Sequence, residues 1–182
     1  MTKACSQFIR TVVGAGIVAA AVALTGCGKH ETMSEFEREK LAEQDLNESL
    51  TAQGAKLKSM RYPIGTAWSV NLSGLTITDD MLRQVRKLGP VSEMNLSKST
   101  VTDDQLGLMQ ELQLTMLLNK LDLSNTAVSD AGIDKLDGMK FLAEMNLVGT
   151  KVTPAAVDRF KKKQRTDPRV IARFKNPTVR LR

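Results

Sequence analysis

Residues 67–88 read AWSVNLSGLTITDDMLRQVRKL, and the same pattern of residue types returns three more times along the chain. The further copies are VSEMNLSKSTVTDDQLGLMQEL over residues 91–112, LNKLDLSNTAVSDAGIDKLDGM over 118–139 and LAEMNLVGTKVTPAAVDRFKKK over 142–163. Successive copies begin 24, 27 and 24 residues apart. A period of this length indicates a repeat protein, in which each unit buries its apolar face against its neighbours.

Each copy is predicted to form a short strand followed by a helix. Apolar residues two apart mark one face of a strand. Each copy begins with a leading apolar residue, which is Ala67, Val91, Leu118 or Leu142. The two apolar strand residues that follow it are Val70 and Leu72, Met94 and Leu96, Leu121 and Leu123, and Met145 and Leu147. A β-branched residue and then a hydroxyl residue follow, the hydroxyls being Thr78, Thr102, Ser129 and Thr153. Hydroxyl side chains favour the N-cap of a helix. Apolar residues then recur at intervals of three, which predicts a helix with one buried stripe.

The pattern L-x-x-L-x-L-x-x-[TN]-x-[IV]-[ST]-D resembles the leucine-rich repeat family, in the bacterial form that has Thr in place of Asn. Thr126 and Thr150 match that column, Ser99 is a near match, and Leu75 departs from it. The resemblance covers about residues 67–163. It implies an α/β fold: a short solenoid, or horseshoe, with parallel strands on the concave face and helices outside. It also implies that the concave face binds a protein or peptide.

Two departures from the pattern refine this prediction. The 27-residue interval places three extra residues around 114–117, which we expect in a loop between a helix and the next strand. Lys163 stands where the other copies bury Leu88, Leu112 and Met139, so the stack of repeats is expected to end there.

The N-terminus is typical of an export signal. Residues 1–26 carry Lys3 and Arg10 but no acid, and the run from Thr11 to Leu24 is apolar and short for a membrane span. The quartet Leu24-Thr25-Gly26-Cys27 resembles the lipobox of bacterial lipoproteins, in which the Cys becomes the lipidated first residue of the mature chain. The alternative is an uncleaved N-terminal anchor. Both predict an exported protein held at the membrane and facing the periplasm or the cell surface.

This processing would leave few reactive side chains for catalysis. Cys5 would leave with the signal, Cys27 would carry lipid, and the single histidine, His30, lies three residues from the anchor. A zinc finger, a disulfide scaffold and a nucleophile–histidine catalytic set are therefore not expected. We predict no enzyme activity, no cofactor and no metal site. Calcium at the Asp79–Asp80 and Asp103–Asp104 pairs is a weaker alternative, because acids beside helix N-termini need no metal.

The chain is predicted to have four parts: a signal peptide over 1–26, a polar helical stalk or linker over 27–66, the repeat domain over 67–165 and a basic cap or tail over 166–182. The stalk helix is expected over about 34–60, because Leu46, Leu50 and Leu57 recur at helical spacings. A short coiled coil is the alternative for this segment.

The formal net charge of +6 is unevenly distributed. Residues 159–182 carry ten basic residues and one acid, whereas residues 27–158 sum to −5. The tail also contains Val170, Ile171, Phe174, Val179 and Leu181. We expect some of these to cover the open edge of the last repeat. The candidate basic rim beside it comprises Lys161, Lys162, Lys163, Arg165, Arg169 and Arg173.

Side chains between the core positions of each predicted strand face the concave surface. The candidate binding residues there are Asn71, Glu93, Asn95, Lys120, Asp122, Glu144 and Asn146, with Ser69 beside them and Trp68 as the nearest aromatic residue. The plain alternative is a solvated strand face. We expect a lipid-anchored module that binds a protein or peptide. The second hypothesis is a structural or adhesive lipoprotein whose tail binds anionic membrane or envelope polymer. Nucleic acid is not expected as a partner, because export removes it and no binding motif is present.

Overall fold

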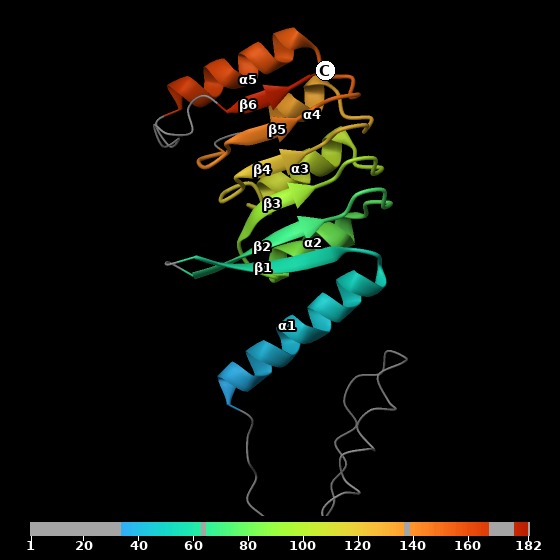
Figure 1. Cartoon of the computed structure of the whole chain (residues 1–182), viewed down its shortest axis with the longest axis vertical. Coiled ribbons are helices and arrows are strands. Elements are labelled where there is room, and N and C mark those ends of the chain that lie inside the picture. The colour runs from blue at the N-terminus through green and yellow to red at the C-terminus, as the bar shows by residue number, and fades with distance from the viewer. Residues whose placement is uncertain (1–33, 63–64, 137–138, 168–176, 182) are drawn as a thin grey trace, which may run out of the picture. The chain divides into compact units, whose positions relative to one another are not determined.

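The computed structural model describes residues 34–62, 65–136, 139–167 and 177–181, and residues 34–182 form one compact unit. Its six strands make one sheet in the order β1 to β6 (Figure 1). The strands are β1 (Lys56–Tyr62), β2 (Gly65–Asn71), β3 (Val91–Asn95), β4 (Lys120–Asp122), β5 (Glu144–Asn146) and β6 (Thr178–Arg180). Strands β2 to β6 are parallel, and β1 is antiparallel to β2. The predicted α/β class is confirmed.

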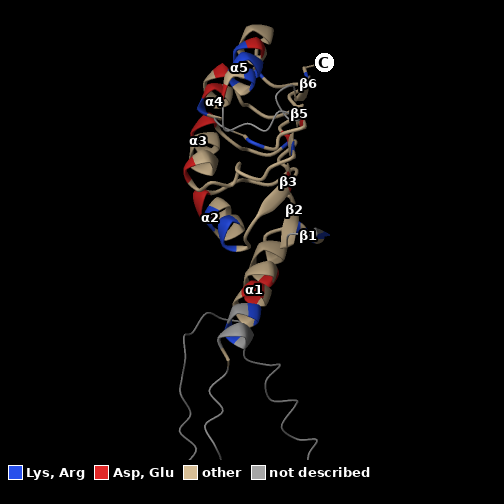
Figure 2. Ribbon diagram, turned by 90° about the vertical axis from the view of Figure 1, so that its left-hand side faces the viewer, with Lys and Arg blue, Asp and Glu red and all other residues tan. Residues whose placement is uncertain are grey.

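Four helices line one side of this sheet. They are α2 (Asp79–Lys87), α3 (Asp103–Glu111), α4 (Asp130–Lys135) and α5 (Pro154–Thr166). Figure 2 shows them stacked in one layer, with the strands in a second layer opposite. A further helix, α1 (Glu35–Ala52), lies at the β1 end of the sheet (Figure 1) and contacts α2 and β1.

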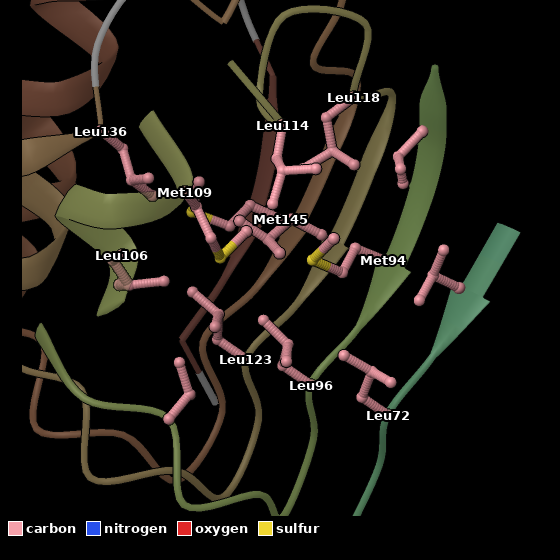
Figure 3. Close-up of a cluster of buried hydrophobic side chains, with 14 of the residues drawn as sticks. Leu72, Met94, Leu96, Leu106, Met109, Leu114, Leu118, Leu123, Leu136 and Met145 are labelled. Carbon is pink, nitrogen blue, oxygen red and sulfur yellow. The ribbon is translucent and has the colours of Figure 1, made fainter. Parts of the chain in front are cut away.

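The predicted strand columns lie in register. Met94 pairs with Val70 and with Leu121, and Leu121 pairs with Met145, so equivalent residues of the four copies are neighbours across the sheet. These side chains point toward the helices and are at most 2% exposed. Figure 3 shows the next column of leucines, Leu72, Leu96 and Leu123, below Met94 and Met145 in the view. The core is therefore built mainly from leucine, methionine and valine, as the low aromatic content requires.

All four predicted helix caps are confirmed. The hydroxyls of Thr78, Thr102, Ser129 and Thr153 each accept a hydrogen bond from a backbone N–H in the first turn of the helix that follows. A different column, the Thr position of the repeat pattern, also has a structural role, which is repeated in three copies. Ser99, Thr126 and Thr150 donate their hydroxyls to the carbonyls of Leu96, Leu123 and Leu147, at 2.6, 2.6 and 2.7 Å. These bonds satisfy buried polar groups where the chain leaves the strand.

The first copy differs from its predicted register. Trp68, not Ala67, pairs with Val91 and joins the core cluster, because a bulge between Trp68 and Ser69 shifts the pairing by one residue. The hydroxyl of Ser92, the extra residue opposite this bulge, lies 3.4 Å from the carbonyl oxygen of Trp68. Trp68 is 7% exposed and packs on the helix side. Trp68, the aromatic residue nearest to the predicted concave face, therefore does not lie on that face.

The predicted stalk helix over 34–60 is confirmed as far as Ala52 and is wrong beyond it. Helix α1 ends at Ala52, and residues 56–62 form strand β1. In β1, Leu57 packs against the core while Lys56 and Lys58 are exposed, which is the two-residue period of a strand. The last turn of α1 is not a free stalk, since Leu50 is fully buried in the repeat core.

The C-terminal end covers the last repeat, as predicted. Residues 178–180 pair with β5 in parallel, and Val179 and Leu181 pack against the core. Val170, Ile171 and Phe174 lie outside the described residues. The three-residue insertion is also confirmed, because residues 112–119 connect α3 to β4 without helix or strand.

Candidate functional site

Twelve side chains form the surface that we call the strand face, on the side of the sheet away from α2–α5. Residues that pair across a sheet point to the same side, and the pairings arrange these twelve in two rows. The first row is Lys58, Ser69, Glu93, Lys120, Glu144 and Thr178. The second row is Lys56, Asn71, Asn95, Asp122, Asn146 and Arg180.

The structure brings all seven predicted binding residues together. They line one shallow hollow of about 320 Å³, together with Ser69, Thr178 and Arg180. Four further residues of this face were not predicted from the sequence: Lys56, Lys58, Thr178 and Arg180. The alternation of Lys56 and Lys58 around Leu57 was the signal for the first two. For Thr178 and Arg180 the repeat pattern offered none, because the tail lies beyond the fourth copy.

The second row is engaged in the turns that follow the strands. The Oδ1 atoms of Asn71, Asn95, Asp122 and Asn146 each accept a hydrogen bond from the backbone N–H two residues ahead, at 3.0, 2.9, 2.9 and 3.2 Å. These are Asx turns, which favour Asn and Asp at this position. The polar ladder predicted as a binding element is thus largely structural.

The turn continues into a left-handed backbone position in every copy. Gly74, Lys98, Asn125 and Gly149 occupy equivalent places with φ between 55° and 73°. Glycine adopts this conformation without strain and asparagine tolerates it, whereas a lysine is unusual there. The second row therefore sets the direction in which the chain leaves each strand.

The first row keeps more of its polar capacity. Oε2 of Glu93 accepts the hydroxyl of Ser69 at 3.1 Å, and Oε1 has no hydrogen-bond partner in the described part of the chain. Lys120 Nζ lies 3.8 Å from Glu144 Oε2, and both side chains are about half exposed (50% and 53%). An exposed pair at this distance contributes little stability. Glu93, Lys120 and Glu144 are therefore available to a partner.

The acids at the helix N-termini link neighbouring copies. Asp103 accepts hydrogen bonds from the backbone N–H and the hydroxyl of Ser129. Asp130 accepts hydrogen bonds from the backbone N–H and the hydroxyl of Thr153, both at 2.7 Å. The backbone and hydroxyl bonds from Thr153 lower the pKa of the Asp130 carboxyl. These acids are occupied by the cap of the following helix. Among the described residues, no group of three or more His, Cys, Asp or Glu side chains is placed to hold a metal ion.

Ion pairs continue along the helix layer. Lys135 pairs with Asp104 at 2.5 Å, and Arg159 lies 3.0 Å from Asp134 and 3.9 Å from Asp130. The hydrogen bond and the charge of Lys135 lower the pKa of Asp104. Figure 2 colours the ribbon of this layer at its acidic and basic residues.

The candidate basic rim is only partly within the described residues. Lys162, Lys163 and Arg165 are exposed on α5, and Lys161 is half-buried. Arg169, Arg173 and the candidate lipidation site Cys27 lie outside the described residues. In the parts that the structure describes, none of the helices combines the length and apolar character needed to cross a bilayer.

A second hollow, of about 940 Å³, lies between α1, the end of α2 and β2. Leu46, Trp68 and Leu88 form its apolar part, and Lys87 is one of the charged residues around it. This hollow could not be predicted from the repeat pattern, because it depends on how α1 packs against the first repeat.

Compared with protein-family models, the sequence matches none, and it matches none of the curated proteins.

Proposed function

We propose that this chain is a lipid-anchored leucine-rich repeat protein of the cell envelope and that it binds a protein partner through the strand face. The observation that carries the proposal is the first row of that face. It places exposed, oppositely charged side chains from consecutive copies side by side, over a hollow shared by β2 to β6.

The repeat assignment is supported by three features of local structure that recur from copy to copy. The strand columns pair in register, the hydroxyl column caps the helices, and the threonine column satisfies the carbonyls of the strand ends. A stack of such units would form the short solenoid that the resemblance implies.

The export and anchoring part of the proposal is supported by sequence alone. The basic start, the apolar run and the Leu24–Cys27 quartet together favour a lipoprotein that faces the periplasm or the cell surface. Lipid on Cys27 would hold the chain at the membrane.

The second candidate is an adhesive lipoprotein that binds anionic membrane or polymer through its basic end. The exposed Lys162, Lys163 and Arg165 on α5 favour it. Its affinity would come from charge alone and would therefore fall steeply with salt.

A capture experiment distinguishes the two candidates. The tagged full chain is recovered from membranes of its own cell in mild detergent, and co-purifying proteins are quantified. The strand-face proposal predicts a partner that is lost with Glu93→Lys and Glu144→Lys but retained with Glu111→Lys, a matched reversal on the exposed end of α3. Capture that ignores both face reversals and disappears in high salt would support the adhesive candidate instead.

A further inference from the structure

Two carboxylates of the first row stand at a fixed spacing on the strand face. Glu93 is on β3 and Glu144 is on β5, with β4 between them. Neighbouring strands lie about 4.8 Å apart, so these two positions are about 9.5 Å apart along the row. Both retain oxygen atoms that can accept hydrogen bonds, as described above.

The charge of the face changes along the same row. Between β3 and β5 the two rows together hold three acids, Glu93, Asp122 and Glu144, and one base, Lys120. At the β1 edge both exposed side chains, Lys56 and Lys58, are basic. The centre of the face therefore attracts cations, and the β1 edge attracts an anion.

We propose that the strand face binds an extended peptide segment with two basic side chains three residues apart and an acidic side chain three residues further along. This inference rests on the proposed function and names the chemistry of its partner. The two basic side chains would pair with Glu93 and Glu144, and the acidic side chain would reach Lys58.

Peptide geometry selects this spacing. In a polyproline II segment, residues three apart lie on the same side and about 9.3 Å from one another. The nearest same-side residues lie about 6.6 Å apart in a β-strand and about 5–6 Å apart in a helix. Neither distance matches the two strand spacings, about 9.5 Å, between Glu93 and Glu144. Seven residues of polyproline II span about 19 Å, which equals the four spacings from β1 to β5.

Lys120 competes with this ligand. It lies between the two carboxylates in the row, and its ammonium group is 3.8 Å from the Glu144 carboxylate. Removing its charge would free Glu144 and would remove a repulsion on the incoming cation. The proposal therefore predicts that one substitution on the face tightens binding.

The test uses fluorescence anisotropy with the full chain in detergent at low salt. The probes are labelled peptides Glu-Pro-Pro-Lys-Pro-Pro-Lys and its reversed sequence, because both directions across the sheet have the same spacing. The controls are a peptide with every charge inverted and one with the two lysines adjacent. At least one of the two dibasic probes should bind more tightly than both controls, and binding should weaken as salt rises.

For each variant, the direction of the change in affinity is predicted as well as its size. Glu93→Gln and Glu144→Gln should each weaken the dibasic probe about two- to fivefold, the effect of one exposed ion pair. Lys120→Gln should tighten it by a similar factor, and Lys58→Gln should weaken it, because the acidic residue of the probe loses its partner. Glu111→Gln, an exposed carboxylate on the helix layer, should leave the affinity unchanged.

Three outcomes would overturn the inference: no binding of either dibasic probe, equal binding of the charge-inverted peptide, or loss of affinity with Lys120→Gln. None of them bears on the proposed function. A protein partner that is captured by the wild-type chain and lost with the face reversals would still support a protein-binding role, with a partner of different chemistry.

Discussion

Leu123→Ala tests the packing of the repeats. Leu123 is fully buried in the third copy, in the row that Leu72 and Leu96 begin (Figure 3), and its carbonyl accepts the hydroxyl of Thr126. The substitution removes three carbon atoms, worth about 2.4 kcal/mol of transfer free energy at about 0.8 kcal/mol each. The cavity left behind raises the expected loss of unfolding free energy to about 4 kcal/mol.

The measurement is thermal and urea unfolding followed by circular dichroism. For a chain of this size, about 4 kcal/mol corresponds to a melting temperature lower by roughly 8–16 °C. Leu117→Ala is the matched control, because it makes the same chemical change at a side chain that is 42% exposed. Its expected loss is within about 0.5 kcal/mol of zero.

A third variant separates core from strand face. Asn95→Ala should cost about 1 kcal/mol, because Oδ1 of Asn95 accepts the N–H of Ser97. Truncating a side chain on a solvated strand face without this hydrogen bond would cost well under about 1 kcal/mol. If Leu123→Ala costs no more than Leu117→Ala, the register of the repeats is wrong.

Three further predictions follow from the chain ends and the helix caps. Intact-mass measurement of protein from its native membrane should show a mature species that begins at lipidated Cys27, and an unmodified full-length chain would contradict this. Deleting residues 166–182 should lower the melting temperature, because it removes the pairing of β6 with β5. It should also weaken salt-sensitive binding to anionic vesicles. An unchanged melting temperature would reject the role of the tail as a cap, and unchanged vesicle binding would reject the basic rim. Because the pKa of Asp130 lies below its ordinary value of 3.8, its contribution to stability should be present above that pH and should be lost as pH falls through the lowered pKa. In urea titrations, Asp130→Asn should destabilise the protein more at pH 6 than at pH 2.5, and an equal loss at both pH values would contradict the assignment.

The repeat columns could be predicted because each has one local physical cause. A strand column follows from the two-residue period, and a cap column from the need of a helix end for a hydroxyl acceptor. The covering of the last strand by Val179 was predictable as well, since the open edge of a sheet needs a partner.

The errors arose where tertiary packing outweighed the local pattern. Residues 56–62 follow a helix and contain apolar residues at helical spacings, but pairing with β2 fixes them as a strand. The bulge beside Trp68 depends on one extra residue, Ser92, which the 24-residue spacing conceals. A correct reading of KLKSMRY by its alternation would have found β1, and with it the two lysines of the strand face.

The residues of the candidate site were predicted from the sequence, but which of them form turns and which are available to a partner was not. The sequence places Asn71 and Glu93 on the same face with equal weight, because both lie between core positions. Only the structure shows that Asn71 is committed to a turn, whereas Glu93 keeps a free carboxylate oxygen. The residues available to a partner are therefore fewer than the seven first identified.

Site-specific photocrosslinking in the native cell tests the central claim, that the strand face is the surface on which a protein partner binds. A photoreactive residue is placed at position 144 on the strand face and, in a matched variant, at position 111 on the helix layer. A crosslinked protein adduct is expected at position 144 and should be absent at position 111. Adducts of equal yield at both positions, or adducts at position 111 alone, would contradict it.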